Sequence, residues 1–568
     1  TDKTVGNKAA LTVNNGVTPS NKVENEPPVI KPSKQDTQKD PTINIDGKTA
    51  LLGDKVYYRV NIDASRLTDT AYKVWRLGMT DDYDQEYLTL DAKHVEILDE
   101  TGRDRTGEFN IQDKDGVLYV FAKTVDTQIP ATGETVKGDP QPADLKAYSE
   151  KSDKDYDPLK DPSIDQSLLG HTYQVVMPMT VTKVKDGHTV ENTATQVTND
   201  KRDKTNTVTN PLKEINPTKD VTVKVGGDSI AGKSVYLNHT FLYRLDSSIL
   251  PPDRAYQTIT DWGGTDQLTT EYDQYLGNWA VYASRDLYRD GQVLAARGEK
   301  IAGSGFDSSK FGGNLFTVDA DDNGKVTVNA TQAYLDLVSA DNEHEAGWVL
   351  YLQCKRIAVA DEVPNTWTET INGQPRESNK VVTKTPDMTP SIHLEKVDTP
   401  TLKQEGQERA DRDDPKQALK MDADSIGITF IITNTSKTDP ATGDGAWFQA
   451  SDLDLADSTI VGDAHVDMDS LAYPDNWDTL VLKPGESVSV TGTLKGVREG
   501  DTHTDRAIVT GTPLVECAPS NGDPFNDKTN GGEDTDPEYS TGDVTEIDGK
   551  QLCADTQVTS NTDDWNGY

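Results

Sequence analysis

Lys55-Val-Tyr-Tyr-Arg-Val60 is a run of β-branched and aromatic residues that predicts a β-strand. Its Tyr58-Arg59 pair returns as Tyr243-Arg244, an offset of 243 − 58 = 185 residues. The chain therefore contains a duplicated domain. Further groups recur at the same offset: Pro32-Ser33-Lys34 with Pro217-Thr218-Lys219, Gly47-Lys48 with Gly232-Lys233, Thr80-Asp81 with Thr265-Asp266, and Glu86-Tyr87 with Glu271-Tyr272.

The two copies also match near their C-terminal ends. There Asn192-Thr193 returns as Asn365-Thr366 and Asn206 as Asn379, an offset of 365 − 192 = 173 residues. The first copy thus carries 185 − 173 = 12 additional residues. We assign them to a Pro/Asp/Lys-rich insertion over residues 126–167, expected to be a surface loop with a helical turn.

Strand-like runs predominate along the whole chain, so the predicted class is all-β. We expect tandem immunoglobulin-like β-sandwich domains in a linear rod, with few short helices. One helix is predicted over Thr331–Val338. Short, proline-containing junctions should make the rod semi-rigid. The predicted segments are a linker or tail over 1–28, the duplicated domains over 29–213 and 214–388, and a third sandwich over 389–568.

Composition narrows the functional classes. The 568 residues carry a net charge of −39, which opposes binding to nucleic acid or to an anionic membrane and makes Ca²⁺ a candidate ligand. No stretch of about 18 apolar residues predicts a membrane span. No signal peptide is recognised at Thr1 and no sorting signal at Tyr568. We therefore expect a monomeric segment of a longer extracellular protein.

Three cysteines are present. Cys354 ends the apolar run that begins at Trp348 and is expected to be a buried thiol. Cys517 and Cys553 flank a polar, Gly/Asn/Asp-rich stretch that has little core of its own. A Cys517–Cys553 disulfide is predicted to staple this region, with two unpaired thiols as the alternative.

The recurring lysine, aspartate and asparagine suggest a chemistry. A lysine amine that is neutral through burial can attack the carboxamide carbon of an asparagine and expel ammonia. A buried, protonated aspartate can polarise that carbonyl and shuttle protons, and folding supplies the proximity. The product is an isopeptide bond made once per molecule, so the protein is not an enzyme in the turnover sense and needs no cofactor. The alternative is ordinary strand-edge lysines and turn asparagines, because duplication alone preserves offsets.

A family resemblance strengthens the cross-link interpretation. Residues 30–386 resemble the paired C-terminal domains of the antigen I/II family of streptococcal surface adhesins. In that family these domains carry Asp-assisted Lys–Asn isopeptide bonds, often bind Ca²⁺, and support an adhesive head on the cell wall. The resemblance implies the trios Lys34/Asp81/Asn206 and Lys219/Asp266/Asn379. It rests on Tyr243-Arg-Leu245, Tyr275-Leu-Gly-Asn-Trp-Ala-Val-Tyr-Ala283, Arg356-Ile-Ala-Val359, Asn372-Gly-Gln-Pro-Arg-Glu-Ser-Asn379, Thr385-Pro386 and Glu214-Ile-Asn-Pro-Thr-Lys-Asp-Val221.

The aspartates depart from the family pattern. Asp82 and Asp84 accompany Asp81, whereas Gln267 follows Asp266 in place of a second aspartate. This leaves the proton shuttle open in detail. Asp82 and Asp84 are candidate Ca²⁺ ligands, with a solvated acidic turn as the alternative.

The third domain resembles the immunoglobulin-like modules of Gram-positive, especially actinobacterial, surface proteins. The resemblance rests on Ser391-Ile-His-Leu-Glu-Lys396, Phe430-Ile-Ile-Thr-Asn-Thr435 and Leu482-Lys-Pro-Gly-Glu486. By analogy of position, Lys396 and Asn561 are a candidate third cross-link. A solvated lysine and a turn asparagine are the alternative.

Together these features predict the stalk of a Gram-positive, cell-wall-anchored adhesin, located at the extracellular cell surface. Through the full-length adhesin its partners would be a host surface, a salivary glycoprotein or other bacteria. One alternative is that these domains themselves bind a host glycoprotein or a partner bacterium. Another is the non-catalytic part of a secreted carbohydrate-active enzyme.

Overall fold

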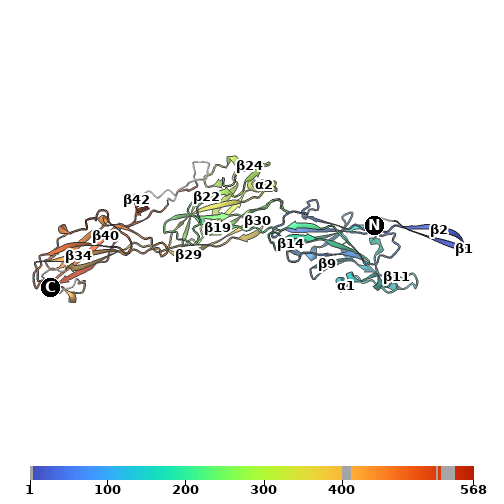
Figure 1. The fold of residues 1–568 in the computed structure, drawn as a ribbon, viewed down its shortest axis with the longest axis horizontal. Helices are drawn as coiled ribbons and strands as arrows, with labels where there is room; N and C mark the ends of the chain where they lie inside the picture. The colour runs from blue at the N-terminus through green and yellow to red at the C-terminus, as the bar shows by residue number, and fades with distance from the viewer. Residues whose placement is uncertain (1–3, 400–410, 520–521, 526–543) are drawn as a thin grey trace.

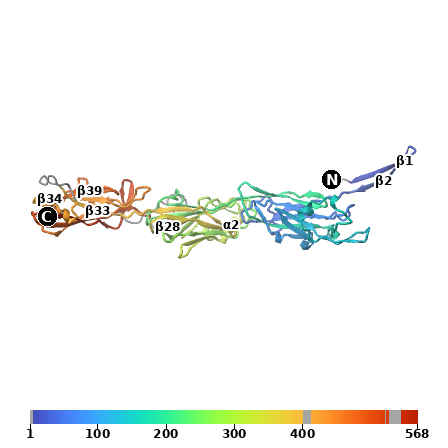
Figure 2. The ribbon, with the colours of Figure 1, turned by 90° about the horizontal axis from the view of Figure 1, so that it is seen from below.

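A computed structural model describes residues 4–399, 411–519, 522–525 and 544–568. Three β-sandwiches follow one another in a line, with a slender hairpin at the N-terminal end (Figure 1). The view at right angles shows the same linear order (Figure 2). The predicted class of tandem immunoglobulin-like sandwiches is therefore confirmed.

The first sandwich consists of two five-stranded antiparallel sheets packed face to face. Short strand pairs and helix α1 (Leu145–Glu150) lie at its edges. The first sheet contains β3 (Ser33–Thr37), β4 (Lys55–Asp63), β14 (Thr172–Val181), β6 (Leu88–Leu90) and β7 (Glu96–Asp99). The second contains β17 (Lys201–Lys204), β16 (Ala194–Thr198), β5 (Leu77–Asp82), β9 (Val117–Ala122) and β8 (Phe109–Lys114). The short pairs are β10 (Thr124–Val125) with β13 (Ser163–Ile164), β11 (Thr127–Gln128) with β12 (Thr135–Val136), and β15 (Thr189–Asn192) with β18 (Val208–Pro211).

The second sandwich repeats this plan. One sheet contains β19 (Thr218–Thr222), β20 (Thr240–Asp246), β28 (Trp348–Arg356), β22 (Asp273–Ala283) and β25 (Lys300–Gly303). The other contains β26 (Phe316–Ala320), β27 (Lys325–Ala330), β21 (Trp262–Gln267), β30 (Trp367–Ile371) and β31 (Gln374–Glu377). The short pairs are β23 (Leu287–Arg289) with β24 (Gln292–Ala295), and β29 (Ala360–Asn365) with β32 (Val381–Thr385).

The third sandwich is smaller. One sheet contains β33 (Ile392–Thr399), β34 (Ser425–Asn434), β39 (Ser487–Lys495) and β37 (His465–Val466). The other contains β36 (Asp454–Val461), β40 (His503–Gly511), β44 (Val558–Thr559) and β45 (Asp563–Gly567). Beside them lie the pair β35 (Phe448–Gln449) with β38 (Val481–Leu482) and the sheet of β41 (Leu514–Glu516), β43 (Lys550–Ala554) and β42 (Val544–Ile547).

Alternating burial along the strands creates one apolar core in each sandwich. In β39 the pattern runs exposed–buried from Ser487, which is the period of two that faces one side of a strand inward. The cores bury large aromatic side chains, including Tyr58, Trp348 and Trp565. Any polar side chain that points inward from these strands is removed from water, which changes the pKa of several buried lysines and aspartates.

The junctions between sandwiches are packed. Leu51 of the first sandwich joins the core of the second, and Ala255 of the second joins the core of the first. At the next junction Ser234 donates a hydrogen bond of 2.7 Å to Asp439 across the boundary. Phe525, which lies between the two disulfide-bonded cysteines in the sequence, is buried against Leu242 and neighbours of the second sandwich.

Local predictions had mixed outcomes. Helix α2 spans Gln332–Ala340, close to the predicted Thr331–Val338, and α1 lies within the predicted insertion. The predicted linker over 1–28 is wrong in part, because β1 (Val5–Val13) and β2 (Gly16–Asn25) form a hairpin there. Its Asn14-Asn15 pair adopts positive φ angles, as a tight hairpin turn requires. The polar stretch between Cys517 and Cys553 lies mostly outside the described residues.

Candidate functional site

A buried lysine–aspartate pair lies between the two sheets of the first sandwich. Lys34 comes from β3, at the edge of one sheet, and Asp81 from β5 in the other. The Lys34 amine contacts the Asp81 carboxylate, and both side chains are fully buried. The strand pattern explains this, because Lys34 occupies an inward position of β3 while its neighbour Gln35 is exposed. The contact brings together two of the three residues predicted for this site.

The second sandwich repeats the pair. The Lys219 amine of β19 contacts the Asp266 carboxylate of β21, again with no significant exposure of either side chain. In both sandwiches an aromatic ring lies beside the amine. The distance from the amine nitrogen to the ring centroid is 4.7 Å for Lys34 and Tyr58, and 4.6 Å for Lys219 and Tyr243. The duplication therefore conserves a three-dimensional arrangement as well as a sequence offset.

Burial changes the acid–base properties of these groups. Loss of water lowers the pKa of the Lys34 and Lys219 amines, which the adjacent carboxylates only partly oppose. Loss of water also raises the pKa of the Asp266 carboxyl, against the opposing effects of Lys219 and Asn365. Both shifts favour the neutral amine and the neutral acid, the protonation states that attack on an amide requires.

The predicted asparagines contact the main chain of the lysines and not their amines. Asn206 Oδ1 accepts a hydrogen bond of 2.9 Å from the Lys34 main-chain N–H, and its Nδ2 donates one of 2.9 Å to the Lys34 carbonyl. Asn379 makes the same two bonds with the main chain of Lys219. The carboxamides thus engage the main chain of each lysine and not its amine.

A different asparagine lies in register with the buried aspartate in each domain. Ala194 of β16 pairs with Asp81, and Asn192, two residues earlier, shares its inward direction and is 1% exposed. Among the described residues neither polar atom of Asn192 has a hydrogen-bond partner. A buried, unpaired carboxamide is costly in an ordinary core, so its position two residues from the strand partner of Asp81 calls for a chemical reason.

The second domain has the same register. Trp367 of β30 pairs with Asp266, and Asn365 lies two residues earlier, 5% exposed. Its amide lies close enough to Asp266 to favour the charged form of that carboxyl. The candidate constellations are therefore Lys34/Asp81/Asn192 and Lys219/Asp266/Asn365.

In the predicted pair of the third domain, Asn561 binds main-chain atoms as Asn206 and Asn379 do. Asn561 Oδ1 accepts from the Leu394 N–H at 2.8 Å, and its Nδ2 donates to the Leu394 carbonyl at 2.9 Å. Lys396 is fully buried, but its amine contacts two aspartates, Asp457 and Asp505. The structure therefore does not bring the Lys396 amine to the Asn561 carboxamide.

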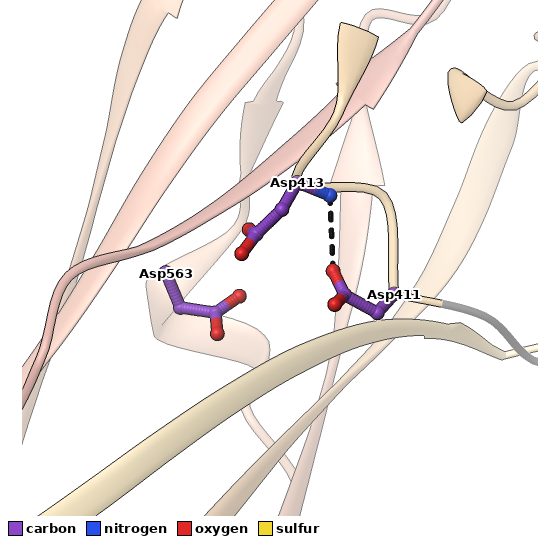
Figure 3. Close-up of side chains that lie close together, drawn as sticks. All are labelled: Asp411, Asp413 and Asp563. Carbon is purple, nitrogen blue, oxygen red and sulfur yellow. Dashed lines mark hydrogen bonds between the residues drawn. The ribbon is translucent and has the colours of Figure 1, made fainter. Parts of the chain in front are cut away.

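The predicted metal ligands do not converge. Asp82 is exposed, and Asp84 pairs with His188, Oδ2 to Nε2, at 2.9 Å. Among the described residues the carboxylates that gather are those of Asp411, Asp413 and Asp563 in the third domain (Figure 3). Their oxygens suit a hard cation such as Ca²⁺, and burial raises the pKa of Asp563 to about 7. Three carboxylates supply fewer oxygens than the six to eight that Ca²⁺ takes, so water or main-chain oxygens would have to complete the sphere.

The cysteines behave as expected. Cys517 and Cys553 form a disulfide that joins β43 to the end of β41, and Cys354 is a buried free thiol. Within the described parts of the chain, helices of the length and apolar character needed to cross a bilayer are absent.

Comparison with known proteins assigns the first two domains to families of cell surface antigens. Residues 32–212 match the family described as the cell surface antigen I/II C2 terminal domain, and residues 216–386 match the family described as the cell surface antigen C-terminus. The aggregation substance of Enterococcus faecalis is 31% identical over 324 residues, which is 56% of this chain and 21% of that protein. The chain therefore spans about a fifth of this relative's length.

Two solved structures are similar to part of this chain. The C-terminal domain of the Streptococcus agalactiae antigen I/II polypeptide BspA is 18% identical, with a TM-score of 0.45. The C-terminal domain of the Streptococcus pyogenes antigen I/II-family protein AspA is 22% identical, with a TM-score of 0.46. Each comparison covers 62% of this chain and 99% of the solved chain.

Proposed function

We propose that the two duplicated domains, which belong to the antigen I/II family of cell surface antigens, form a stalk segment of an adhesin that closes each domain by a Lys–Asn isopeptide bond. Domains of this family are surface-antigen modules and not enzymes. The bonds would join Lys34 to Asn192 and Lys219 to Asn365, with Asp81 and Asp266 as the assisting acids.

One observation carries the proposal. In each domain a buried amine contacts a buried carboxyl, and a buried asparagine lies two residues before the strand partner of that aspartate. The neutral amine attacks the carboxamide carbon while the protonated aspartate donates a hydrogen bond to its oxygen. The aspartate then carries a proton from the lysine nitrogen to the leaving ammonia. The fold holds the reactants together, so no cofactor takes part.

The bond would connect the first sheet covalently to β15, the short strand that leads into the second sheet. Lys34 lies in β3 of the first sheet, and Asn192 is the last residue of β15, two residues before β16 of the second sheet begins at Ala194. The closed loop spans 192 − 34 = 158 residues. On the chain-entropy model such a loop stabilises the fold by about 5 kcal/mol, chiefly by restricting the unfolded chain.

The role as a stalk agrees with the shape. Three sandwiches in a line with packed junctions separate the two ends of the chain, as the support of a distal adhesive head requires. The full-length protein would then hold that head away from the bacterial surface and attach to a host surface, a salivary glycoprotein or another bacterium. The segment itself would lie outside the cell, anchored to the wall through the rest of the protein.

The test is the mass and connectivity of the purified chain under reducing conditions. Each Lys–Asn bond removes one ammonia. A tryptic digest separates the rival acceptors of Lys219, because Asn365 falls in peptide 357–376 and Asn379 in peptide 377–380. We expect the lysine peptide to be linked to 357–376.

Matched variants sharpen this result. Asn365→Ala should leave Lys219 unlinked, so that the mass deficit shrinks by one ammonia. Asn379→Ala should keep the full deficit. Recovery of unlinked Lys34 and Lys219 peptides from the folded wild-type chain would refute the proposal.

A further inference from the structure

The third domain contains a buried lysine enclosed by carboxyl groups. Lys396 of β33 belongs to one sheet, and Asp457 of β36 and Asp505 of β40 belong to the other. The amine contacts Asp457, and its distance to Asp505 Oδ1 is 2.5 Å. All three side chains are at most 2% exposed. The cluster lies outside the residues that match the antigen I/II family.

Strand register relates this cluster to the other two domains. In the first domain Asp81 pairs with Ala194, and the candidate acceptor Asn192 lies two residues before Ala194. In the third domain Asp457 pairs with Ala507, and Asp505 lies two residues before Ala507.

The second domain has the same spacing, with Asp266 opposite Trp367 and Asn365 two residues earlier. Asp457 therefore occupies the position of the assisting aspartates. Asp505 occupies the position of the acceptor asparagines, with a carboxyl group where they have a carboxamide.

We propose that the third domain closes itself by an isopeptide bond between Lys396 Nζ and Asp505 Cγ, formed with loss of water. The inference rests on the same chemistry as the function proposed above but concerns a different domain and a different leaving group. The neutral amine attacks Cγ of the protonated Asp505 carboxyl, and the C–OH bond breaks. The hydroxyl leaves as water with a proton from the amine. No electron transfer or additional reactant is needed.

The surroundings supply the proton chemistry. Burial raises the pKa of Asp457 to about 6, so this group can pass a proton to the departing hydroxyl and take the amine proton in its place. His503 Nε2 lies 3.3 Å from Asp505 Oδ2, and its ring is 1% exposed. Asp457 thus shares the Lys396 amine with Asp505, and the His503 ring lies beside the other oxygen of the Asp505 carboxyl.

Burial also makes condensation favourable. In water an amine and a carboxylic acid prefer to exchange a proton, because both ions are well solvated. In this core the ions lose that solvation, and the reacting atoms are already in contact. The Phe430 ring, 5.5 Å from the amine, and the buried Trp565 help to exclude water. Asn561 does not compete for the amine, since both of its polar atoms engage the main chain of Leu394.

Peptide mapping of the full-length chain tests the inference. After trypsin, Lys396 falls in peptide 385–403 when its amine is blocked, and Asp505 falls in peptide 499–506. We expect one linked species made of these two peptides, lighter than their sum by one water. Asp457 and Asn561 fall in other peptides. Linkage to either of them, or recovery of peptide 499–506 unlinked, would overturn the assignment.

The Asp505→Asn variant gives a sharper readout. Its carboxamide would react with loss of ammonia and yield the same amide, so the mature variant and the mature wild type should have identical masses. Their unreacted chains differ by the exchange of one hydroxyl for one amino group. A mass difference between the folded proteins would contradict the proposal.

Asp457→Ala and Lys396→Met should each abolish the linked peptide. The same digest reports the Lys34 and Lys219 cross-links from their own peptides. Absence of the Lys396–Asp505 bond can therefore be distinguished from absence of the bonds in the first two domains.

Discussion

The Asn379 carboxamide is hydrogen-bonded at both of its polar atoms to the main chain of Lys219, with each bond 2.9 Å long. Asn206 holds Lys34 in the same way, and Asn561 holds Leu394. In every domain an asparagine near the last strand therefore clips the first strand by its backbone. This clip fixes the position of β19, and hence of the amine that β19 carries.

The clip leads to the first prediction. Asn379→Ala removes two partly buried hydrogen bonds, which should lower the stability of the second domain by about 1–3 kcal/mol. The cross-link should still form, so thermal unfolding should shift while the intact mass changes only by the substitution itself. Reappearance of one ammonia in the variant would show that Asn379, and not Asn365, is the acceptor.

The second prediction concerns the assisting acid in the first domain. Asp81→Asn keeps the shape of the side chain but removes the acid that shuttles protons. Lys34 should therefore remain unlinked. The measured mass should exceed the mass expected for the cross-linked variant by one ammonia. The domain should also unfold at lower temperature, because a buried amine loses its partner, a change that typically costs about 3–5 kcal/mol. Asp82→Asn is the matched control, since Asp82 is adjacent and exposed. Equal effects of the two substitutions would contradict the assignment.

Much of this arrangement was predictable from the sequence. The offset of 185 residues identified the duplicated domain, and it aligned Lys34 with Lys219 and Asp81 with Asp266. Alternation distinguishes Asp81 from Asp82, because neighbours on a strand face opposite sides of the sheet. The strand pattern therefore pointed to the aspartate that contacts Lys34.

The acceptor could not be chosen in the same way. Asn192 and Asn206 both recur at the offset of 173, so the repeat does not separate them. The choice depends on which strand residue pairs with Asp81. That residue is Ala194, two residues after Asn192, and the pairing of distant strands cannot be read from the sequence. Asp505 could not be predicted as a site residue for a related reason. The chain has 96 acidic residues, and nothing in the sequence distinguishes one aspartate until its strand partner is known. The hairpin over residues 5–25 was missed because its polar composition is typical of a linker.

The third prediction is mechanical. A bond from Lys34 to Asn192 leaves 212 − 192 = 20 residues of the first domain outside the closed loop, including β16 and β18. Pulling on both ends can therefore extend the domain by only about 70 Å, at about 3.4 Å per residue, before force passes through the bond. The Asn192→Ala variant should instead release about 600 Å, the length of the whole domain at the same rise.

Single-molecule force spectroscopy on the full chain measures both lengths. Domains that resist extension altogether would argue for a bond closer to the end of the domain. Full extension of the wild-type domain would argue for no bond.

The fourth prediction is a pH dependence. Asp36 is fully buried in the first domain, and loss of water raises its pKa from the ordinary value to about 7. The folded state then binds a proton more tightly than the unfolded chain. This contribution to stability is present below about pH 4 and is lost as the pH rises through about 7, amounting to at most about 4 kcal/mol.

Asp36→Asn should remove this slope. The variant should unfold at a higher temperature than the wild type near pH 8 and at a similar temperature near pH 4, as measured by thermal melting across that range. The second domain offers an internal reference, because the equivalent position, 36 + 185 = 221, is the buried apolar residue Val221. A gain in stability that is the same at both pH values would show that proton binding by Asp36 is not the cause.

The last prediction concerns the junction between the second and third domains. Phe525 is 1% exposed and packs with Leu242 and Tyr351 on the outer face of the second sandwich, while its carbonyl accepts a hydrogen bond of 2.6 Å from Lys300. Truncation of a buried phenylalanine typically costs about 3–5 kcal/mol, and here that cost falls on the contact between domains and not on either core. Phe525→Ala should therefore widen the distribution of distances between spin labels placed on the two sandwiches, while the unfolding temperature of each sandwich stays the same. Tyr568→Ala is the control, because Tyr568 is an exposed aromatic residue at the end of the chain. An unchanged distance distribution would mean that the remaining contacts, such as the hydrogen bond from Ser234 to Asp439, hold the junction without Phe525.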